Sequence, residues 1–217
     1  MQRDIVAVVG PDARAYVHGQ VSQNVQSLAV GESRWTLVLA PNGRVDVLAR
    51  VLCAADDRLE LDTEVGFGDV LHDRLNRFRI RVKAELETST ADLPGETPLV
   101  GWWGDGVWLA GVFDYETARV EAGWPAMGTE IVSGERIPAE VAVVPVSVDF
   151  TKGCYPGQEL VERMDSRGSQ APRQLRIVSV DDATNPDVEI TSVAGEKALA
   201  YVKRGVAVGD VPGPTSR

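Results

Sequence analysis

The segment Lys152–Glu159, which reads KGCYPGQE, brings together the residue types that favour a reactive thiol. A cysteine reacts through its thiolate, and a nearby cation or a helix N-terminus stabilises that anion. Lys152 precedes Cys154 by two residues, and a helical pattern begins just after the Pro-Gly turn. Gln158 adds hydrogen-bonding groups, whereas the charge of Glu159 opposes thiolate formation. On residue types alone, an activated thiol and a turn with an incidental cysteine are equally good interpretations.

The groups that commonly assist a cysteine are scarce elsewhere in the chain. There are two cysteines and two histidines, and neither His18 nor His72 follows Cys154 in the sequence, so a papain-like nucleophile is not indicated. The CxxC and HxxxH spacings typical of zinc and iron–sulfur ligands are missing, so we expect no metal site built from this chain alone. Cys53 lies in an apolar run and is interpreted as a small core residue, and no disulfide is expected.

A second candidate is a carboxylate near the end of a predicted helix. Asp114–Ala122 reads as a helix with Asp114 as its cap and Gly123 just past its end. Glu121 falls in the last turn, where the negative end of the helix dipole disfavours a carboxylate by about 0.3–1 kcal/mol when it is exposed. Such a charge can belong to a functional acid or to an ordinary helix surface, and the residues alone favour the surface.

A third candidate is a cluster of cations. Alternation of apolar residues predicts a strand over residues 78–86, with three cations on the face opposite Ile80 and Val82. Such a face suits a polyanionic ligand or partner. An ordinary solvent-exposed strand face, with its cations paired to neighbouring acids, explains this cluster slightly better. The basic residues of this stretch are Arg74, Arg77, Arg79, Arg81 and Lys83.

The overall charge limits the classes of partner. The chain of 217 residues carries 22 Lys and Arg against 32 Asp and Glu, for a net charge of −10. An acidic protein repels phosphate backbones, so we expect no direct nucleic-acid binding. No apolar run is long enough for a transmembrane helix, and the start MQRDIVAVVGPD reads as a buried strand rather than a secretory signal. These features favour a cytoplasmic protein without a membrane partner.

Helices and strands that would position these groups alternate along the chain. Asn42-Gly43 between two apolar runs predicts a hairpin, and a second hairpin is predicted at Asp105-Gly106, with Trp102, Trp103 and Trp108 as packing residues. Interleaved helices and antiparallel hairpins favour an α+β fold. The remaining predicted strands are 5–9, 59–61, 141–148, 175–180, 188–190 and 198–202, and the helices are 12–18, 63–78 (capped by Thr63) and 158–164.

Several of these segments resemble one known family. KGCYPGQE is similar to the K-G-C-[FY]-x-G-Q-E signature of YgfZ-type folate-binding proteins, which are kin to the glycine-cleavage T-protein. The similarity continues through other segments in the family's order, from about residue 5 to about residue 170. The matching segments are 16–25 (YVHGQVSQNV), 40–44 (APNGR), 77–82 (RFRIRV), 119–123 (RVEAG) and 137–140 (IPAE).

The resemblance implies a fold and a function. It implies a T-protein-like folate-binding domain with ferredoxin-like parts at 1–168, followed by a small β-barrel module at 169–217 that is shorter than is usual for the family. It implies that tetrahydrofolate is the cofactor and that Glu121 contacts the pterin. The family assists iron–sulfur cluster assembly or repair, and so indirectly supports tRNA modification, and Cys154 is the residue related to that role. Its expected partners are folate and iron–sulfur client proteins or assembly factors.

Site residues follow from the matched motifs. The resemblance assigns a catalytic role to Cys154 and Lys152, and folate binding to Glu121, Arg119, Asn24, Tyr155, Gln158 and Glu159. An alternative is a folate-dependent aminomethyltransferase or other one-carbon transferase. That chemistry needs an aspartate near the folate, and Gln23-Asn24 stands where the family often has Asn-Asp. Folate binding in an accessory factor is therefore favoured over transferase activity.

Overall fold

The computed structural model describes residues 2–92, 114–166 and 171–208 of the chain. The predicted hairpin at Asp105-Gly106 and the tryptophans around it lie outside the described residues. Within the described ranges, helices and antiparallel strands interleave, as the sequence predicted for an α+β protein. No described helix is long and apolar enough to cross a membrane.

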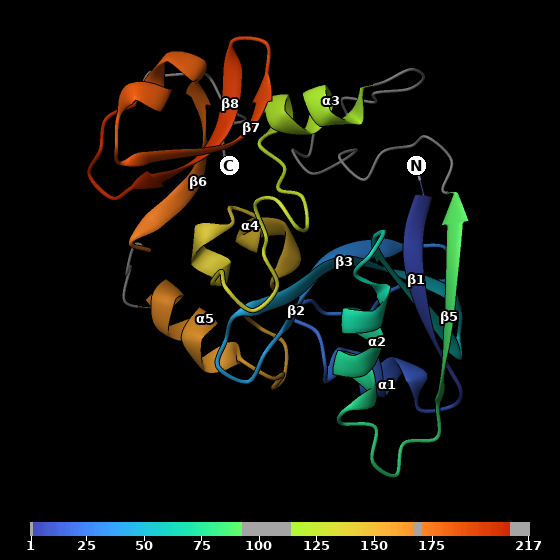
Figure 1. Ribbon diagram of the computed structural model, residues 1–217. Coiled ribbons are helices and arrows are strands. Elements are labelled where there is room, and N and C mark those ends of the chain that lie inside the picture. The colour runs from blue at the N-terminus through green and yellow to red at the C-terminus, as the bar shows by residue number, and fades with distance from the viewer. Residues whose placement is uncertain (1, 93–113, 167–170, 209–217) are drawn as a thin grey trace.

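The N-terminal part is built on a five-stranded sheet. All its neighbouring strands pair antiparallel, in the order β2-β3-β4-β1-β5. The β2–β3 connection is the predicted Asn42-Gly43 hairpin, and Gly43 has a φ of 83°. Figure 1 shows β1 and β5 together at one edge. The strands are β1 (Gln2–Val9), β2 (Ser33–Leu39), β3 (Val45–Ala55), β4 (Arg58–Glu64) and β5 (Glu85–Asp92).

Helices α1 (Ala13–His18) and α2 (Gly68–Asn76) cover one face of this sheet. Alternate strand residues point into the shared core because successive side chains of a strand face opposite sides. Helix α1 also contacts α2 directly, since the Tyr16 hydroxyl donates a hydrogen bond to the Leu75 carbonyl. Core residues from β3 are Val47, Ala49, Val51 and Cys53, which confirms Cys53 as a buried residue.

The opposite face carries the elements that lead to the predicted site. A second core joins β2 and β3 to the segments that follow residue 114, and the rings of Trp35 and Trp124 meet there at 4.6 Å. These segments are the helices α3 (Tyr115–Ala122), α4 (Val144–Ser147) and α5 (Gln158–Ser166) and the 3-10 turn η1 (Pro138–Glu140). The predicted cap Asp114 and the left-handed Gly123 bound α3 as expected.

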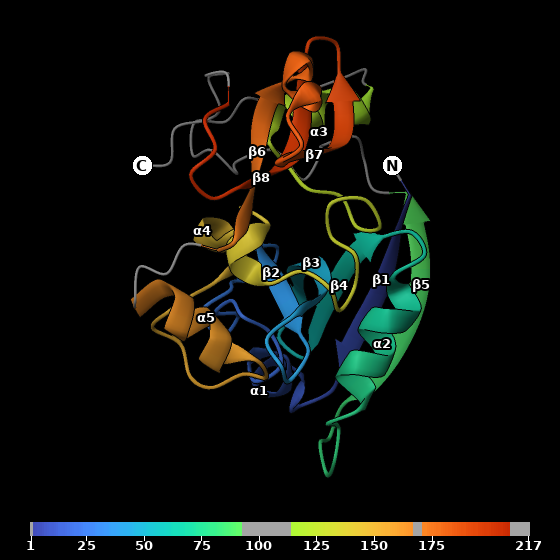
Figure 2. The ribbon, with the colours of Figure 1, turned by 60° about the vertical axis from the view of Figure 1, so that its left-hand side comes forward.

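The C-terminal part is a three-stranded antiparallel sheet in the order β6-β8-β7. It comprises β6 (Arg173–Ser179), the 3-10 turn η2 (Val180–Thr184), β7 (Val188–Ala194) and β8 (Lys197–Lys203), so the three predicted strands are confirmed. Within the described residues the sheet does not close, and the expected barrel is not seen. Helix α3 packs against β7 and β8, and Figure 2 shows this sheet at the end of the molecule opposite α1.

Three local predictions were wrong. Residues 77–84 form no strand, because Arg81 adopts a left-handed φ of 61° that an extended chain does not allow; the strand begins at Glu85. The predicted strand 141–148 instead holds the short helix α4, with Pro145 in its first turn, where its missing N–H costs nothing. Thr63 does not cap α2: it lies in β4, and its hydroxyl donates to the Leu48 carbonyl.

Candidate functional site

Cys154 lies on an exposed loop between α4 and α5. We call residues 149–157 the thiol loop. The sulfur of Cys154 is free and exposed, whereas the ring of Tyr155, the next residue, is buried in the second core. The thiol is therefore presented to solvent by a chain segment that is attached to the core one residue later.

The segment after α1 holds the start of the thiol loop and the helix before it. The backbone N–H of Asp149 donates to the Ser22 carbonyl at 3.0 Å. The Ser22 hydroxyl donates to the Ser147 carbonyl at 2.6 Å, and the Gln23 side-chain amide donates to the Val146 carbonyl at 3.0 Å. Residues 22–23 thus hold α4 and the start of the thiol loop against the segment that follows α1.

Lys152 makes the deepest attachment of the loop. Its ammonium donates to the backbone carbonyls of His18 and Val21, at the C-terminal end of α1 and just beyond it, and lies 4.9 Å from the centre of the Tyr155 ring. Burial lowers the pKa of Lys152 to about 8, while the Asp149 carboxylate acts in the opposite direction. In the described residues no hydrogen bond joins Lys152 to the sulfur of Cys154, so the lysine is directed at the backbone rather than at the thiol.

Polar side chains gather around this lysine. Asn24, one of the predicted site residues, hydrogen-bonds Asp149, whose pKa is lowered by the Thr151 hydroxyl and backbone and also by Asn24. The Nδ1 atom of His18 accepts the Val25 N–H at 3.4 Å, and burial and the Lys152 charge lower the pKa of His18. A neutral imidazole, an aspartate and a lysine therefore converge beside Asn24.

The sequence reasoning did not assign roles to His18 and Asp149. Their positions in the sequence could have pointed to them. His18 lies in the matched segment 16–25, and Asp149 lies three residues before Lys152. The acid next to Asn24 is therefore Asp149, from a distant part of the chain, rather than a neighbour in the sequence.

Gly157, in the Pro-Gly turn, allows the start of α5 to pack closely against the β2–β3 hairpin. Gly157 has a φ of 81°, and a Cβ on it would lie 2.5 Å from the Ala40 carbonyl oxygen. On the other side of the same contact, a Cβ on Gly43 would lie 2.5 Å from the Leu160 Cβ. The β2–β3 hairpin and the start of α5 approach so closely that neither position tolerates a side chain. The matched segments APNGR and KGCYPGQE are thus two sides of one contact.

The side chains that follow the thiol have different surroundings. Gln158 accepts the Tyr155 N–H on its side-chain oxygen at 3.0 Å, across the first turn of α5. Glu159 is exposed on that same turn. Burial raises the pKa of Tyr155 to about 12, so its hydroxyl stays protonated at neutral pH. Of these residues, only Glu159 offers an exposed charged group.

Arg119 and Glu121 lie in another region, on α3. Arg119 is only 2% exposed and forms an ion pair with the fully buried Glu130 at 2.9 Å. The hydroxyls of Thr191 and Ser192 on β7 also donate to Glu130. These bonds join α3 to the C-terminal sheet, so the guanidinium of Arg119 is engaged within the protein.

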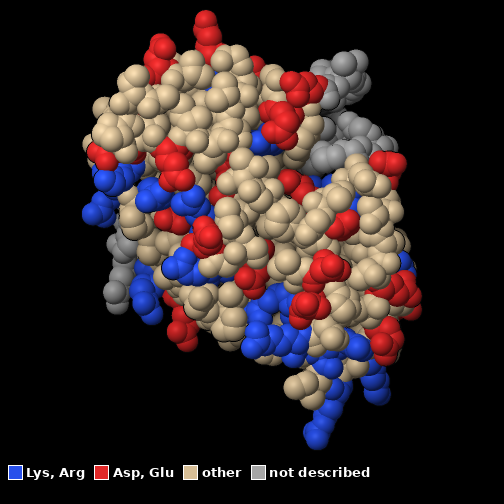
Figure 3. All heavy atoms as spheres, viewed as in Figure 1, with Lys and Arg blue, Asp and Glu red and all other residues tan. Residues whose placement is uncertain are grey.

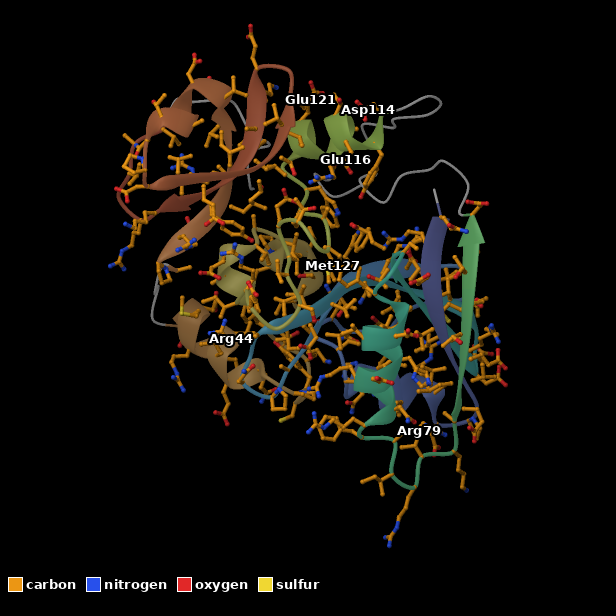
Figure 4. The ribbon with its side chains drawn as sticks, in the orientation of Figure 1. Arg44, Arg79, Asp114, Glu116, Glu121 and Met127 are labelled. Carbon is orange, nitrogen blue, oxygen red and sulfur yellow. The ribbon has the colours of Figure 1, made fainter. Side chains whose placement is uncertain are left out.

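Glu121 is exposed in the last turn of α3, and within the described residues its carboxylate takes part in no hydrogen bond or ion pair. Figure 4 shows it on α3, at the end of the molecule far from Arg79. The carboxylate is therefore exposed and, in the part of the chain that the structure describes, unpaired. The same helix carries the Tyr115 hydroxyl, which is buried and has no hydrogen-bond partner among the described residues; burial, together with nearby Glu64, raises its pKa.

The predicted site residues thus form two groups. Asn24, Lys152, Tyr155 and Gln158 belong to the thiol loop and its attachment, with Cys154 and Glu159 exposed there, whereas Arg119 and Glu121 lie on α3. No hydrogen bond or ion pair between described residues links the two groups. Among the described residues there is also no cluster of three or more His, Cys, Asp or Glu side chains arranged to hold a metal ion.

Comparison with solved structures identifies the architecture. The structure matches the crystal structure of glycine cleavage system aminomethyltransferase T from Bartonella henselae with a TM-score of 0.73, covering 93% of this chain and 76% of that one at 16% identity. The chain has the T-protein fold. The match covers 93% of the chain, so the predicted T-protein-like architecture is confirmed at the level of the fold.

Sequence comparison adds relatives of known name or organism. No protein-family model matches. An uncharacterised protein of Haemophilus influenzae is 26% identical over 88% of this chain and 75% of its own length. The iron–sulfur cluster assembly factor IBA57 homologue of Neurospora crassa mitochondria is 24% identical over 97% of this chain, which spans 61% of that relative. The homologue of Cryptococcus neoformans is 34% identical over 43% of this chain and 26% of its own length.

Proposed function

We propose that this protein is a tetrahydrofolate-binding accessory factor that assists the assembly or repair of iron–sulfur clusters. One combination supports this proposal: a T-protein fold, sequence similarity to iron–sulfur cluster assembly factors, and a solvent-exposed cysteine on a firmly attached loop. We also propose a YgfZ-type role, which would affect tRNA modification indirectly. The proposed location is the cytoplasm, and the proposed partners are iron–sulfur client proteins or assembly factors.

The folate part of the proposal depends on Glu121. A carboxylate accepts two parallel hydrogen bonds from an amino-pyrimidine edge, and such charge-assisted pairs are strong and geometrically specific. The Glu121 carboxylate has no partner in the described protein and is exposed, so it fits this role. When bound, tetrahydrofolate would supply the pterin that this carboxylate recognises.

The cysteine part depends on how the thiol loop is held. Cys154 is exposed, while Lys152 two residues before it and Tyr155 one residue after it are fixed to the domain. An exposed thiol on a fixed backbone is suited to transient contact with a client protein or with a cluster carried by that protein. Since the ammonium of Lys152 is bound to backbone carbonyls, we propose that it acts by positioning the loop.

Direct binding measurements test the folate part. Titration calorimetry with tetrahydrofolate should show binding by the wild type and weaker binding by Glu121→Ala, by about tenfold or more for loss of a charge-assisted bidentate pair. Glu196→Ala is the matched control, because Glu196 is an exposed glutamate in the β7–β8 turn. Equal affinity of the two variants, or no binding by the wild type, contradicts the folate proposal. Turnover of an aminomethyl donor would favour the transferase instead.

Complementation tests the cysteine part separately. Cells that lack their own copy should regain the activity of iron–sulfur enzymes with the wild-type gene and fail to do so with Cys154→Ala. Because Cys154 is exposed, the variant should fold normally, which thermal unfolding checks. Full complementation by Cys154→Ala would exclude a role for the thiol while leaving folate binding intact.

A further inference from the structure

The loop that follows α2 is a second exposed feature, far in sequence from the thiol loop. We call residues 77–83 the basic loop. It holds four of the chain's 22 Lys and Arg residues within seven positions, and no acid interrupts it. Figure 1 shows it extending beyond the end of α2, away from the rest of the molecule. Figure 3, in the same view, shows Lys and Arg side chains gathered at that end.

The base of the basic loop is fixed. One arginine, Arg79, turns inward and donates to the Ala84 carbonyl at 2.7 Å and to Glu85 at 3.0 Å. On the other side, the Asp12 carboxylate accepts the Lys83 N–H at 2.8 Å, and the Asp12 N–H donates to the Lys83 carbonyl at 3.3 Å. The loop is therefore held through Arg79 and Lys83, and it has a defined shape.

The tip presents charge and an apolar side chain together. Ile80 is 77% exposed, the most exposed of the large apolar side chains in the described residues. Its neighbours Arg77, Arg81 and Lys83 are exposed and have no ion-pair partner among the described residues. Arg81 holds a left-handed φ of 61°, a conformation that non-glycine residues rarely adopt.

From this arrangement we infer that the basic loop docks a protein partner with an acidic surface around an apolar recess. Ile80 would enter the recess, and the three free cations would meet carboxylates around it. Interfaces of this kind combine a buried apolar anchor with a charged rim that steers the encounter. The charge of the loop is opposite to the net charge of −10 of the whole chain, so the molecule would approach an acidic partner with this end first.

Nucleic acid fits this loop less well. Bases bind by stacking on free aromatic faces and by contacts from many cations to phosphates. The only aromatic ring of the loop, Phe78, already faces the guanidinium of Arg74 at 5.2 Å, and the exposed tip is aliphatic. An anionic membrane also fits less well. Because Arg79 turns inward, the loop exposes three cations, whereas basic segments that bind anionic membranes present about four to eight or a broad apolar face.

In-cell photocrosslinking tests the inference. A photoreactive amino acid at position 80 should crosslink to a protein in the source organism. That protein, identified by mass spectrometry and purified, should bind the wild-type chain with an affinity that falls as salt rises. The double variant Arg77→Glu/Arg81→Glu should weaken binding by about tenfold or more, and Ile80→Asp should also weaken it.

Matched controls make the result decisive. Arg176→Glu reverses an exposed charge on β6, and Arg77→Lys/Arg81→Lys keeps the charge of the loop, so both should bind as the wild type does. Crosslinks only to RNA, to lipid or to a second copy of this chain would overturn the inference. So would a purified partner whose affinity is unchanged by charge reversal in the basic loop. The outcome is independent of folate binding and of Cys154.

Discussion

The thiol loop and the basic loop are both held in place by a cation, but the thiol loop is held by contacts with distant residues and the basic loop by contacts with nearby ones. Each leaves a helix, presents a chemically conspicuous side chain to solvent, and uses one cation to hold its own backbone. In the thiol loop the cation, Lys152, reaches carbonyls more than 130 residues away in the sequence, at His18 and Val21. In the basic loop the cation, Arg79, reaches a carbonyl five residues away, at Ala84.

This difference teaches that a cation beside a reactive residue need not act on that residue. The spacing of Lys152 and Cys154 left an activated thiol and an incidental cysteine equally open, and the Lys152 ammonium is in fact bound to the backbone carbonyls of His18 and Val21. The loop held by distant contacts depends on the tertiary fold, and the loop held by local contacts depends mainly on its own sequence.

The largest effect is expected at the close contact beneath the thiol loop. Gly157→Val should lower the free energy of unfolding by about 3 kcal/mol or more, because the new side chain meets the Ala40 carbonyl and φ is positive. Chemical denaturation measures the change. The control is Gly195→Val, in the open β7–β8 turn, where strain acts without a clash. Equal losses would mean that strain alone, rather than contact with the hairpin, explains the effect.

Removal of the lysine comes next. Lys152→Met keeps the length of the side chain and leaves the His18 and Val21 carbonyls without a donor, which should cost about 2–3 kcal/mol. Hydrogen exchange should show faster exchange in residues 149–157, and Cys154 should be alkylated at a changed rate. Lys152→Arg, which keeps a donor, should recover part of the loss. If Lys152→Met is as stable as the wild type, the lysine does not hold the loop.

The same lysine predicts a pH dependence. Its pKa is lowered by burial to about 8 from 10.5, so the folded chain releases this proton before the unfolded chain does. The cost of burying the charge is fully present below pH 8 and is relieved as the pH rises toward 10.5, so stability rises in that window. The wild type should therefore gain stability relative to Lys152→Met over this range, as measured by denaturation at several pH values. A constant difference would contradict the lowered pKa.

The local anchor of the basic loop should matter less. Arg79→Ala removes one hydrogen bond to the Ala84 carbonyl and an exposed ion pair with Glu85, for a loss of about 1 kcal/mol. Faster hydrogen exchange should be confined to residues 77–84. A loss as large as that of Lys152→Met would remove the contrast between the two loops.

The smallest effect is expected at the exposed tip. Ile80→Ser should change the free energy of unfolding by no more than about 0.5 kcal/mol, because the side chain is largely in solvent already. Denaturation measures it, and Leu75→Ser, in the core beneath, serves as the contrasting case. A large loss at Ile80 would mean that the side chain packs against the protein.

Local rules of sequence determined many elements of this protein. Asn42-Gly43 with its flanking apolar runs specified the β2–β3 hairpin, and Asp114 and Gly123 bounded α3, because turn and cap preferences act over a few residues. The matched motifs led to the T-protein fold, and Cys154 was correctly expected near the start of a helix. These features depend on neighbours along the chain.

Only the tertiary structure decided the rest. The alternation in residues 78–86 fits a strand, but pairing with β1 begins only at Glu85. Sequence also could not show that Lys152 binds carbonyls at the end of α1, or that Arg119 and Glu121, two residues apart, have opposite surroundings. Strand pairing, burial and the partner of a charge are set by which distant segments meet, and no local pattern encodes that.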